Sequence, residues 1–111
     1  MLDINVQSFK RVDLITVSGR VDSSTAPELE ETLEERMGEG RYSLVLDLSD
    51  VNYLSSAGLR TLVSALRNCK KKGGDVRIAT PSERVTEVMS LAGLDTLFTS
   101  YDDVTVAVGS Y

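Results

Sequence analysis

The chain has 111 residues, a length that argues for one domain with a single hydrophobic core. Its formal net charge of −5, from 17 acidic and 12 basic residues, disfavours non-specific binding of nucleic acid. No segment reaches the roughly 20 apolar residues of a membrane span, and no signal peptide is evident, so we expect a cytoplasmic protein without a membrane contact. Histidine is absent and there is one cysteine, which excludes histidine-dependent catalysis and the common zinc clusters. We therefore expect neither enzymatic activity nor a cofactor.

The first forty residues predict a hairpin followed by a helix. Apolar residues alternate with polar ones over 2–6, and the segment 12–18 is richer in apolar residues, so the two are expected to pair as antiparallel strands. A loop then leads into a helix, for which Thr25 and Glu28 fit a capping box. This helix has one apolar face and one glutamate-rich face, and we expect glycines at 38 and 40 to end it. Its apolar face comprises Ala26, Leu29, Leu33 and Met37.

The segment 44–60 contains a sharp change of pattern. Nearly continuous apolar residues over 44–48 predict a buried parallel strand, followed by a short turn. From Leu59 the apolar spacing becomes helical and continues to Cys69, which we expect to be a small buried side chain. Ser55 and Ser56 lie where this helix begins and where the first backbone N–H groups lack partners. A serine hydroxyl there caps the helix, and the same position favours a phosphate.

The rest of the chain continues the alternation of strands and helices. Lysines and glycines over 70–74 predict the end of the second helix, and Val76–Ala79 predict another strand. Thr80 and Glu83 fit a second capping box, which opens a helix that we expect to end at Gly93.

The C-terminal residues are more ambiguous. Apolar residues over 94–98 fit a short last strand or an apolar plug. In the segment 101–111, β-branched residues favour a strand, whereas Asp102 or Asp103 as an N-cap favours a helix. The alternation from Leu44 onward implies right-handed βαβ units. We therefore predict an α/β fold, with a mixed, mostly parallel sheet of four to five strands, an N-terminal antiparallel hairpin and about four helices.

The residues around the two serines resemble a known signature. Residues 47–59, Asp-Leu-Ser-Asp-Val-Asn-Tyr-Leu-Ser-Ser-Ala-Gly-Leu, are similar to the motif of STAS domains, specifically of the bacterial anti-sigma factor antagonists. The usual form there is Asp-Ser-Ser/Thr-Gly-Leu, and the first of its two hydroxyl residues accepts a phosphate. Aligning the Gly-Leu pair places Ser56 at the acceptor position, Ser55 where the Asp usually is, and Ala57 in place of the second hydroxyl residue. The resemblance therefore implies phosphorylation of Ser56, with Ser55 as the alternative acceptor.

The resemblance covers almost the whole chain, which we expect to be one STAS domain over 1–111, ending in a helix. Gly19-Arg-Val-Asp22 is similar to the family's Gly-x-Leu/Val-Asp segment, whose Asp lies near the phosphoserine. Asp22 either organises the turn or shapes the surface that a kinase contacts, and both interpretations stay open. Arg60 contacts a partner or a phosphate, or is merely solvated. The partner-binding residues that the resemblance implies are Asp22, Ser23, Ser24, Ser55, Ser56, Ala57, Gly58 and Arg60.

The function that the resemblance implies is that of a binding protein switched by phosphorylation. Its dephosphorylated form binds an anti-sigma factor, often a serine protein kinase, and so releases a sigma factor. The kinase phosphorylates the serine, and a metal-dependent serine phosphatase reverses the modification. An alternative is an interaction-only STAS module of a larger signalling or transport assembly. A receiver-like domain phosphorylated on aspartate is less consistent, because the acidic pair at 102–103 is misplaced, and a serine hydrolase would lack its histidine base.

Overall fold

A five-stranded sheet organises residues 2–111, the part of the chain that this computed structural model describes. The strands lie in the order β1-β2-β3-β4-β5. β1 pairs antiparallel with β2 and every other pair is parallel, which confirms the predicted α/β fold and its N-terminal hairpin. The strands are β1 (Leu2–Ser8), β2 (Asp13–Val21), β3 (Ser43–Leu54), β4 (Asp75–Ala79) and β5 (Ser100–Tyr101); the helices are α1 (Ala26–Gly38), α2 (Ser56–Lys71), α3 (Glu83–Leu91) and α4 (Val104–Gly109).

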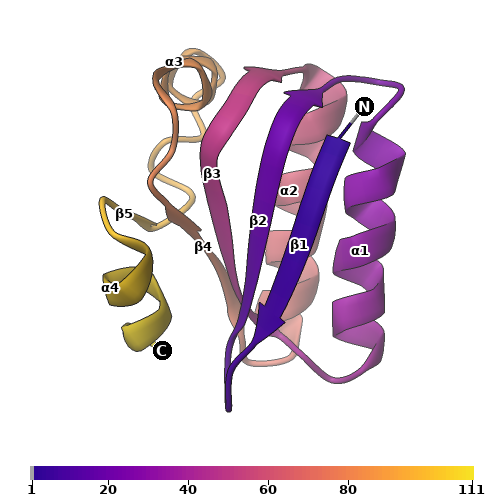
Figure 1. Cartoon of the computed structure of the whole chain (residues 1–111), viewed down its shortest axis with the longest axis vertical. Coiled ribbons are helices and arrows are strands. Elements are labelled where there is room, and N and C mark those ends of the chain that lie inside the picture. Colours follow the sequence, from indigo (N-terminus) through magenta and orange to yellow (C-terminus); the bar gives the residue numbers. More distant parts are fainter. Residues whose placement is uncertain (1) are drawn as a thin grey trace.

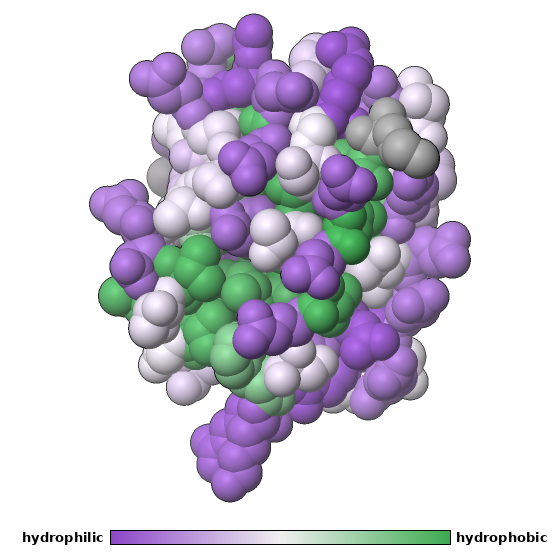
Figure 2. All heavy atoms as spheres, in the orientation of Figure 1, coloured by the Kyte–Doolittle hydropathy of each residue, from purple (hydrophilic) through white to green (hydrophobic). Residues whose placement is uncertain are grey.

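Two apolar clusters lie on opposite faces of the sheet, because successive strand residues point to opposite sides. The larger cluster joins one face of the sheet to α1, α2 and α3, and both Leu46 and Leu62 are fully buried in it, as expected of a strand and a helix that pack together. The smaller cluster lies beneath α4, where Ala107 meets Val45. Figure 1 shows α1 and α2 side by side and α4 apart from them. Figure 2 shows apolar side chains gathered around α4, where Val106 is exposed.

β3 is longer than the sequence predicts. The expected turn after Leu48 is wrong, because the strand continues to Leu54. Ser49 and Asp50 are exposed in this second half, while Val51 is buried again. β2 is long enough to pair with the extension, and irregularities in their register accommodate the polar stretch.

Both predicted capping boxes are wrong. Thr25 stands at the N-cap of α1 but makes no side-chain cap hydrogen bond. Its hydroxyl instead donates to the Arg20 carbonyl at 2.7 Å and accepts from the Asp22 N–H at 2.9 Å. The Thr25 hydroxyl is therefore bonded within the loop and does not cap α1.

The N-cap of α3 is Ser82 rather than Thr80. Its hydroxyl accepts from the Val85 N–H at 3.2 Å and donates to the Val51 carbonyl at 2.7 Å. Thr80 has a left-handed φ of 46° and donates to the Asp47 carboxylate at 2.8 Å. Asp47 therefore has the hydrogen-bond partner that a carboxylate within a buried strand needs.

The C-terminal segment folds as a helix, as the resemblance implied. The Asp103 carboxylate caps α4 by accepting from the Val106 N–H at 3.0 Å. Before it, Phe98 is buried as an apolar plug, while the last strand is only the two-residue β5. Cys69 is fully buried, as expected. None of the helices within residues 2–111 has the length and hydropathy needed to cross a membrane.

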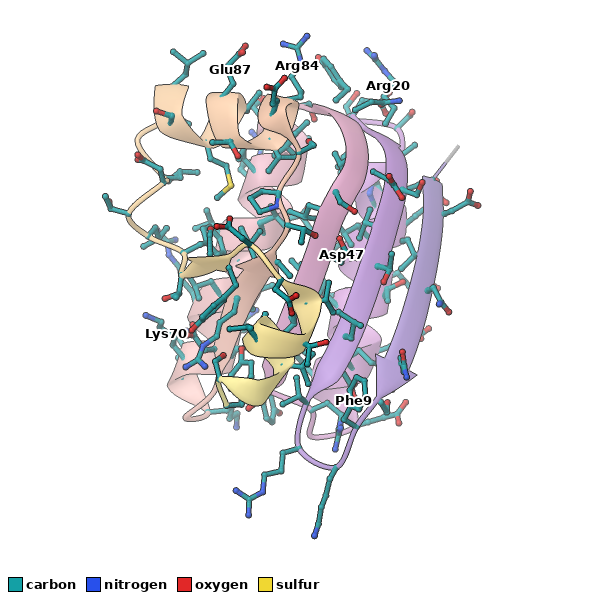
Figure 3. The ribbon with its side chains drawn as sticks, turned by 60° about the vertical axis from the view of Figure 1, so that its left-hand side comes forward. Phe9, Arg20, Asp47, Lys70, Arg84 and Glu87 are labelled. Carbon is teal, nitrogen blue, oxygen red and sulfur yellow. The ribbon has the colours of Figure 1, made fainter. Side chains whose placement is uncertain are left out.

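A buried ion cluster holds the hairpin at the end of β2 that lies away from the serines. Asp13 is completely buried, and the Arg41 Nε donates to its Oδ1 at 3.0 Å. Arg36 lies 3.7 Å from the other carboxylate oxygen. Arg41 also donates to the Phe9 and Lys10 carbonyls. Figure 3 shows Phe9 at this end of the molecule, opposite Arg20.

Candidate functional site

The carboxyl ends of β2 and β3 bring together two segments that are more than thirty residues apart. Val21 and Leu54 end the strands and are paired in register. The Ser55 N–H donates to the Val21 carbonyl at 2.9 Å, so the loop that begins at Asp22 lies beside the start of α2. Binding sites of open α/β sheets commonly form at such carboxyl ends. The structure thus brings together the segment at Asp22 and the two serines, which the sequence analysis identified separately. We call this end of the sheet, where β2 and β3 finish, the edge.

A groove between α1 and α2 begins at this edge. Ser23 from the loop lines it together with Ala57 and Arg60 from α2. These three predicted partner-binding residues therefore share one surface feature, although they come from two separate segments. Ser24 is also exposed in the same loop, whereas Gly58 is buried.

The two serines have different environments. Ser55 is the N-cap of α2, with an extended backbone and a side chain that accepts from the Gly58 N–H at 3.2 Å. Ser56 is the first residue of the helix and is exposed. Within residues 2–111, no hydrogen bond engages the Ser56 hydroxyl. Capping therefore explains Ser55 but not Ser56, whose hydroxyl faces solvent at the positive end of a helix dipole.

Gly58 allows α2 to begin close to the sheet. A Cβ at this position would lie 2.7 Å from Leu54 Cδ1 and 2.7 Å from Val21 Cγ1. Real side chains avoid such distances, so only glycine fits without displacing its neighbours. Its role is to fix where the first turn of α2, and hence Ser56, stands relative to the strand ends.

Asp22 organises the loop between β2 and α1. Its Oδ1 accepts from the Ser24 N–H at 2.9 Å, the Ser24 hydroxyl at 2.7 Å and the Thr25 N–H at 3.1 Å. Its Oδ2 accepts from the Arg20 Nε at 3.0 Å. The hydrogen bond from the Ser24 hydroxyl, with those from the two backbone groups and Arg20, holds the pKa of Asp22 well below its usual range. Asp22 is therefore ionised at neutral pH and braces the loop.

Sequence reasoning missed a pair of residues at the same edge. Arg20 and Tyr53 are neighbours in the β2–β3 register, and the Arg20 guanidinium lies 3.8 Å from the centre of the Tyr53 ring. The stack and the bond to Asp22 hold an otherwise flexible arginine in one place. Figure 3 shows Arg20 at the end of the molecule that also carries Arg84. The sequence held no signal for this pair, because both residues lie beyond the strands predicted at 12–18 and 44–48.

Comparison with known proteins identifies the fold. The model of the STAS domain family matches residues 3–107. The chain belongs to the STAS domain family. The anti-sigma-B factor antagonist of Staphylococcus epidermidis is 30% identical over 98 residues, which cover 86% of this chain and 91% of that protein. The crystal structure of an anti-sigma factor antagonist from Mycobacterium paratuberculosis superposes with a TM-score of 0.89 at 28% identity, over 99% of this chain and 93% of that one.

A solved structure of much lower sequence identity has the same fold. The phosphorylated form of the Bacillus cell fate determinant SpoIIAA has a TM-score of 0.78 at 14% identity, over 97% of this chain and 98% of that one. At this identity the likeness concerns the fold alone. The order of strands and helices in this STAS domain is thus compatible with large changes of sequence.

The edge of this STAS domain presents a hydroxyl and charged groups rather than a metal centre. Within residues 2–111, no group of three or more histidine, cysteine or acidic side chains is arranged to hold a metal ion. The groups gathered at the edge are the exposed Ser56 hydroxyl, the Asp22 carboxylate and the Arg20 guanidinium. Such an arrangement suits recognition by another protein, because a rigid loop and a helix start offer fixed donors and acceptors.

Proposed function

We propose that this STAS domain is an anti-sigma factor antagonist. In its dephosphorylated form it binds an anti-sigma factor of the serine protein kinase type in the cytoplasm and so releases a sigma factor. The observation that carries the proposal is the exposed Ser56 hydroxyl, which the helix cap does not use, beside the braced loop at Asp22. The names of the relatives in Staphylococcus and Mycobacterium support the same function.

Phosphorylation of Ser56 would act as the switch. A phosphate adds about −1.5 to −2 charges at neutral pH. At the start of α2 the helix dipole stabilises that charge by ~0.3–1 kcal/mol, so the fold is expected to survive. The same charge at a protein interface must be desolvated and matched, so the partner would dissociate. A metal-dependent serine phosphatase would restore the binding form.

The surface for the anti-sigma factor would combine the loop and the helix start. It comprises the predicted residues at 22–24, 55–58 and 60, and we add Arg20 and Tyr53 because they stack on each other at the same strand ends. Arginine and tyrosine contribute strongly to many interfaces, and a preorganised pair loses little entropy on binding.

The test measures binding and phosphorylation of matched variants with the purified anti-sigma factor and ATP. Wild type should gain one phosphate, mapped to Ser56 by mass spectrometry, and should lose affinity when it is modified. Ser56→Ala should bind as wild type does and resist inactivation. Ser56→Asp should bind at least tenfold more weakly (~1.4 kcal/mol) without a change in thermal stability.

A matched control separates charge from position. Thr105→Asp introduces the same carboxylate into the first turn of another exposed helix, α4, and should leave the affinity unchanged. A phosphate on Ser55 would contradict the choice of acceptor. If genuine Ser56-phosphorylated protein bound as tightly as wild type, the domain would instead be an interaction-only module.

A further inference from the structure

A second groove runs along α2 next to the first, between this helix and the segment that follows α3. Its apolar floor is formed by Leu59, Val63 and Leu94, and its rim carries Arg60, Arg67 and Lys71. The floor residues are half-buried, whereas the three basic side chains are exposed. We call this feature the α2–α3 groove. It lies beside the groove at Ser23 along α2, and both Arg60 and Ser64 border the two grooves.

The charge along the groove differs from that of the chain as a whole. α2 has no acidic residue, and its basic residues at 60, 67 and 71 follow a helical spacing that places them on one stripe. The whole chain has a net charge of −5, and the adjacent helix α1 carries five glutamates on its sequence. The positive stripe is therefore a local feature beside an acidic helix.

The separation of the basic stripe on α2 from the glutamates on α1 restricts which partners can occupy the groove. A nucleic-acid duplex or an anionic membrane is broad enough to meet the glutamates of α1 as well, which opposes binding. A narrow acidic segment can contact the stripe alone. The apolar floor requires that the segment also carry apolar side chains on one side, as an amphipathic helix does.

We infer that the α2–α3 groove binds an acidic amphipathic helix of a partner protein. Its apolar face would cover Leu59, Val63 and Leu94, and its carboxylates would pair with the rim. From Arg60 to Lys71 the rim spans eleven residue-to-residue steps of helix, roughly 16 Å, which corresponds to about three turns of a partner helix. The inference does not depend on Ser56 or on the identity of the anti-sigma factor.

The test uses a designed helical peptide of about 18 residues with leucines on one face and glutamates on both flanks. A matched peptide has every glutamate replaced by lysine. The acidic peptide should bind wild type saturably in fluorescence anisotropy and shift the NMR signals of Val63 and Leu94. The basic peptide should bind at least tenfold more weakly. Equal binding of the two peptides, no saturable binding, or shifts at other residues would overturn the inference.

Matched variants test the rim itself. The double variant Arg67→Glu/Lys71→Glu should bind the acidic peptide at least tenfold more weakly than wild type does. Lys10→Glu/Arg11→Glu, at the tip of the hairpin, should change the affinity less than twofold. Each reversal removes one positive and adds one negative charge, so both variants lower the net charge by the same amount. If both variants lost affinity for the acidic peptide equally, the peptide would respond only to the net charge of the protein, and the inference would be overturned.

Two other occupants are distinguishable in the same variants. If a DNA duplex or phosphatidylserine vesicles bound wild type and lost binding in Arg67→Glu/Lys71→Glu, the groove would not be a site for an acidic helix. If sedimentation showed a wild-type dimer that this variant dissociates, the occupant would be a second copy of the chain. Either result would overturn the inference as stated.

Discussion

Gly58→Ala tests how closely α2 approaches the sheet, because the change adds one methyl group at the tightest point. The new Cβ would lie 2.7 Å from both Leu54 Cδ1 and Val21 Cγ1. The leucine end can rotate, but the valine is β-branched and stiff. Overpacking of this kind costs about 1–3 kcal/mol, while alanine is favoured over glycine in a helix by about 0.5–1 kcal/mol. We therefore expect the free energy of unfolding to fall by about 1 kcal/mol.

The assay is urea denaturation of wild type, Gly58→Ala and the control Gly38→Ala. Gly38 also lies in a helix, yet no atom stands within 4 Å of the Cβ that alanine would add there. The control should therefore keep or slightly raise the stability of wild type. If Gly58→Ala were as stable as Gly38→Ala, the packing between α2 and the strand ends would have room for a methyl group. Glycine would then not be what positions Ser56.

Three further predictions concern the core and the buried thiol. Leu62→Ala should lower the free energy of unfolding by about 2–5 kcal/mol in urea, because the side chain is fully buried; a loss below about 1 kcal/mol would contradict its place in the core. Gly74→Ala should lower the melting temperature more than Gly38→Ala, because its Cβ would collide with the Tyr42 carbonyl oxygen, whereas a Cβ at Gly38 meets nothing within 4 Å; the reverse ranking would refute this. Burial raises the pKa of Cys69 from 9.0 to about 11, so the folded protein keeps a proton that the unfolded chain loses in this range. Stability should therefore fall as the pH rises from about 9 to 11, and the stability advantage of wild type over Cys69→Ala should shrink over that range; an advantage independent of pH would argue against a buried thiol.

The order of strands and helices could be predicted because apolar periodicity reports on burial directly. The alternation at the N-terminus and the helical spacing after Leu59 correspond to β1 and α2. The length of β3 could not be predicted, because Ser49 and Asp50 are typical of a turn. Their strand conformation depends on pairing with β2, which the local sequence does not encode.

The caps were predicted wrongly, and the buried charge was not predicted at all, for a related reason. A local motif assigned Thr80 to a helix cap, but its hydroxyl bonds to Asp47, thirty-three residues away. Asp13 falls within the predicted strand 12–18 and is completely buried, because two arginines from α1 and the segment after it reach its carboxylate. Partners that are distant in the sequence thus determine whether a polar side chain caps a helix or is buried, and a single sequence does not reveal those partners.

The site was predictable in its location but not in its detail. The switch from strand to helix placed Ser55 and Ser56 at the start of α2. Which hydroxyl caps the helix depends on where the backbone turns from extended to helical, and that transition falls between these two residues. The Arg20–Tyr53 stack depends on strand register and could not be read from spacing alone.

The loop at Asp22 is almost self-contained, and this has an evolutionary consequence. The side-chain hydrogen bonds that shape it join residues 20–25 to one another and leave the apolar core untouched. Mutations at residues 22–24 are therefore expected to leave the core of the sheet intact, whereas Val21 and Thr25 on either side are buried. After gene duplication, a copy of this domain can therefore alter this surface through the codons of residues 22–24, while Val21, the serine and the scaffold that presents it are inherited unchanged.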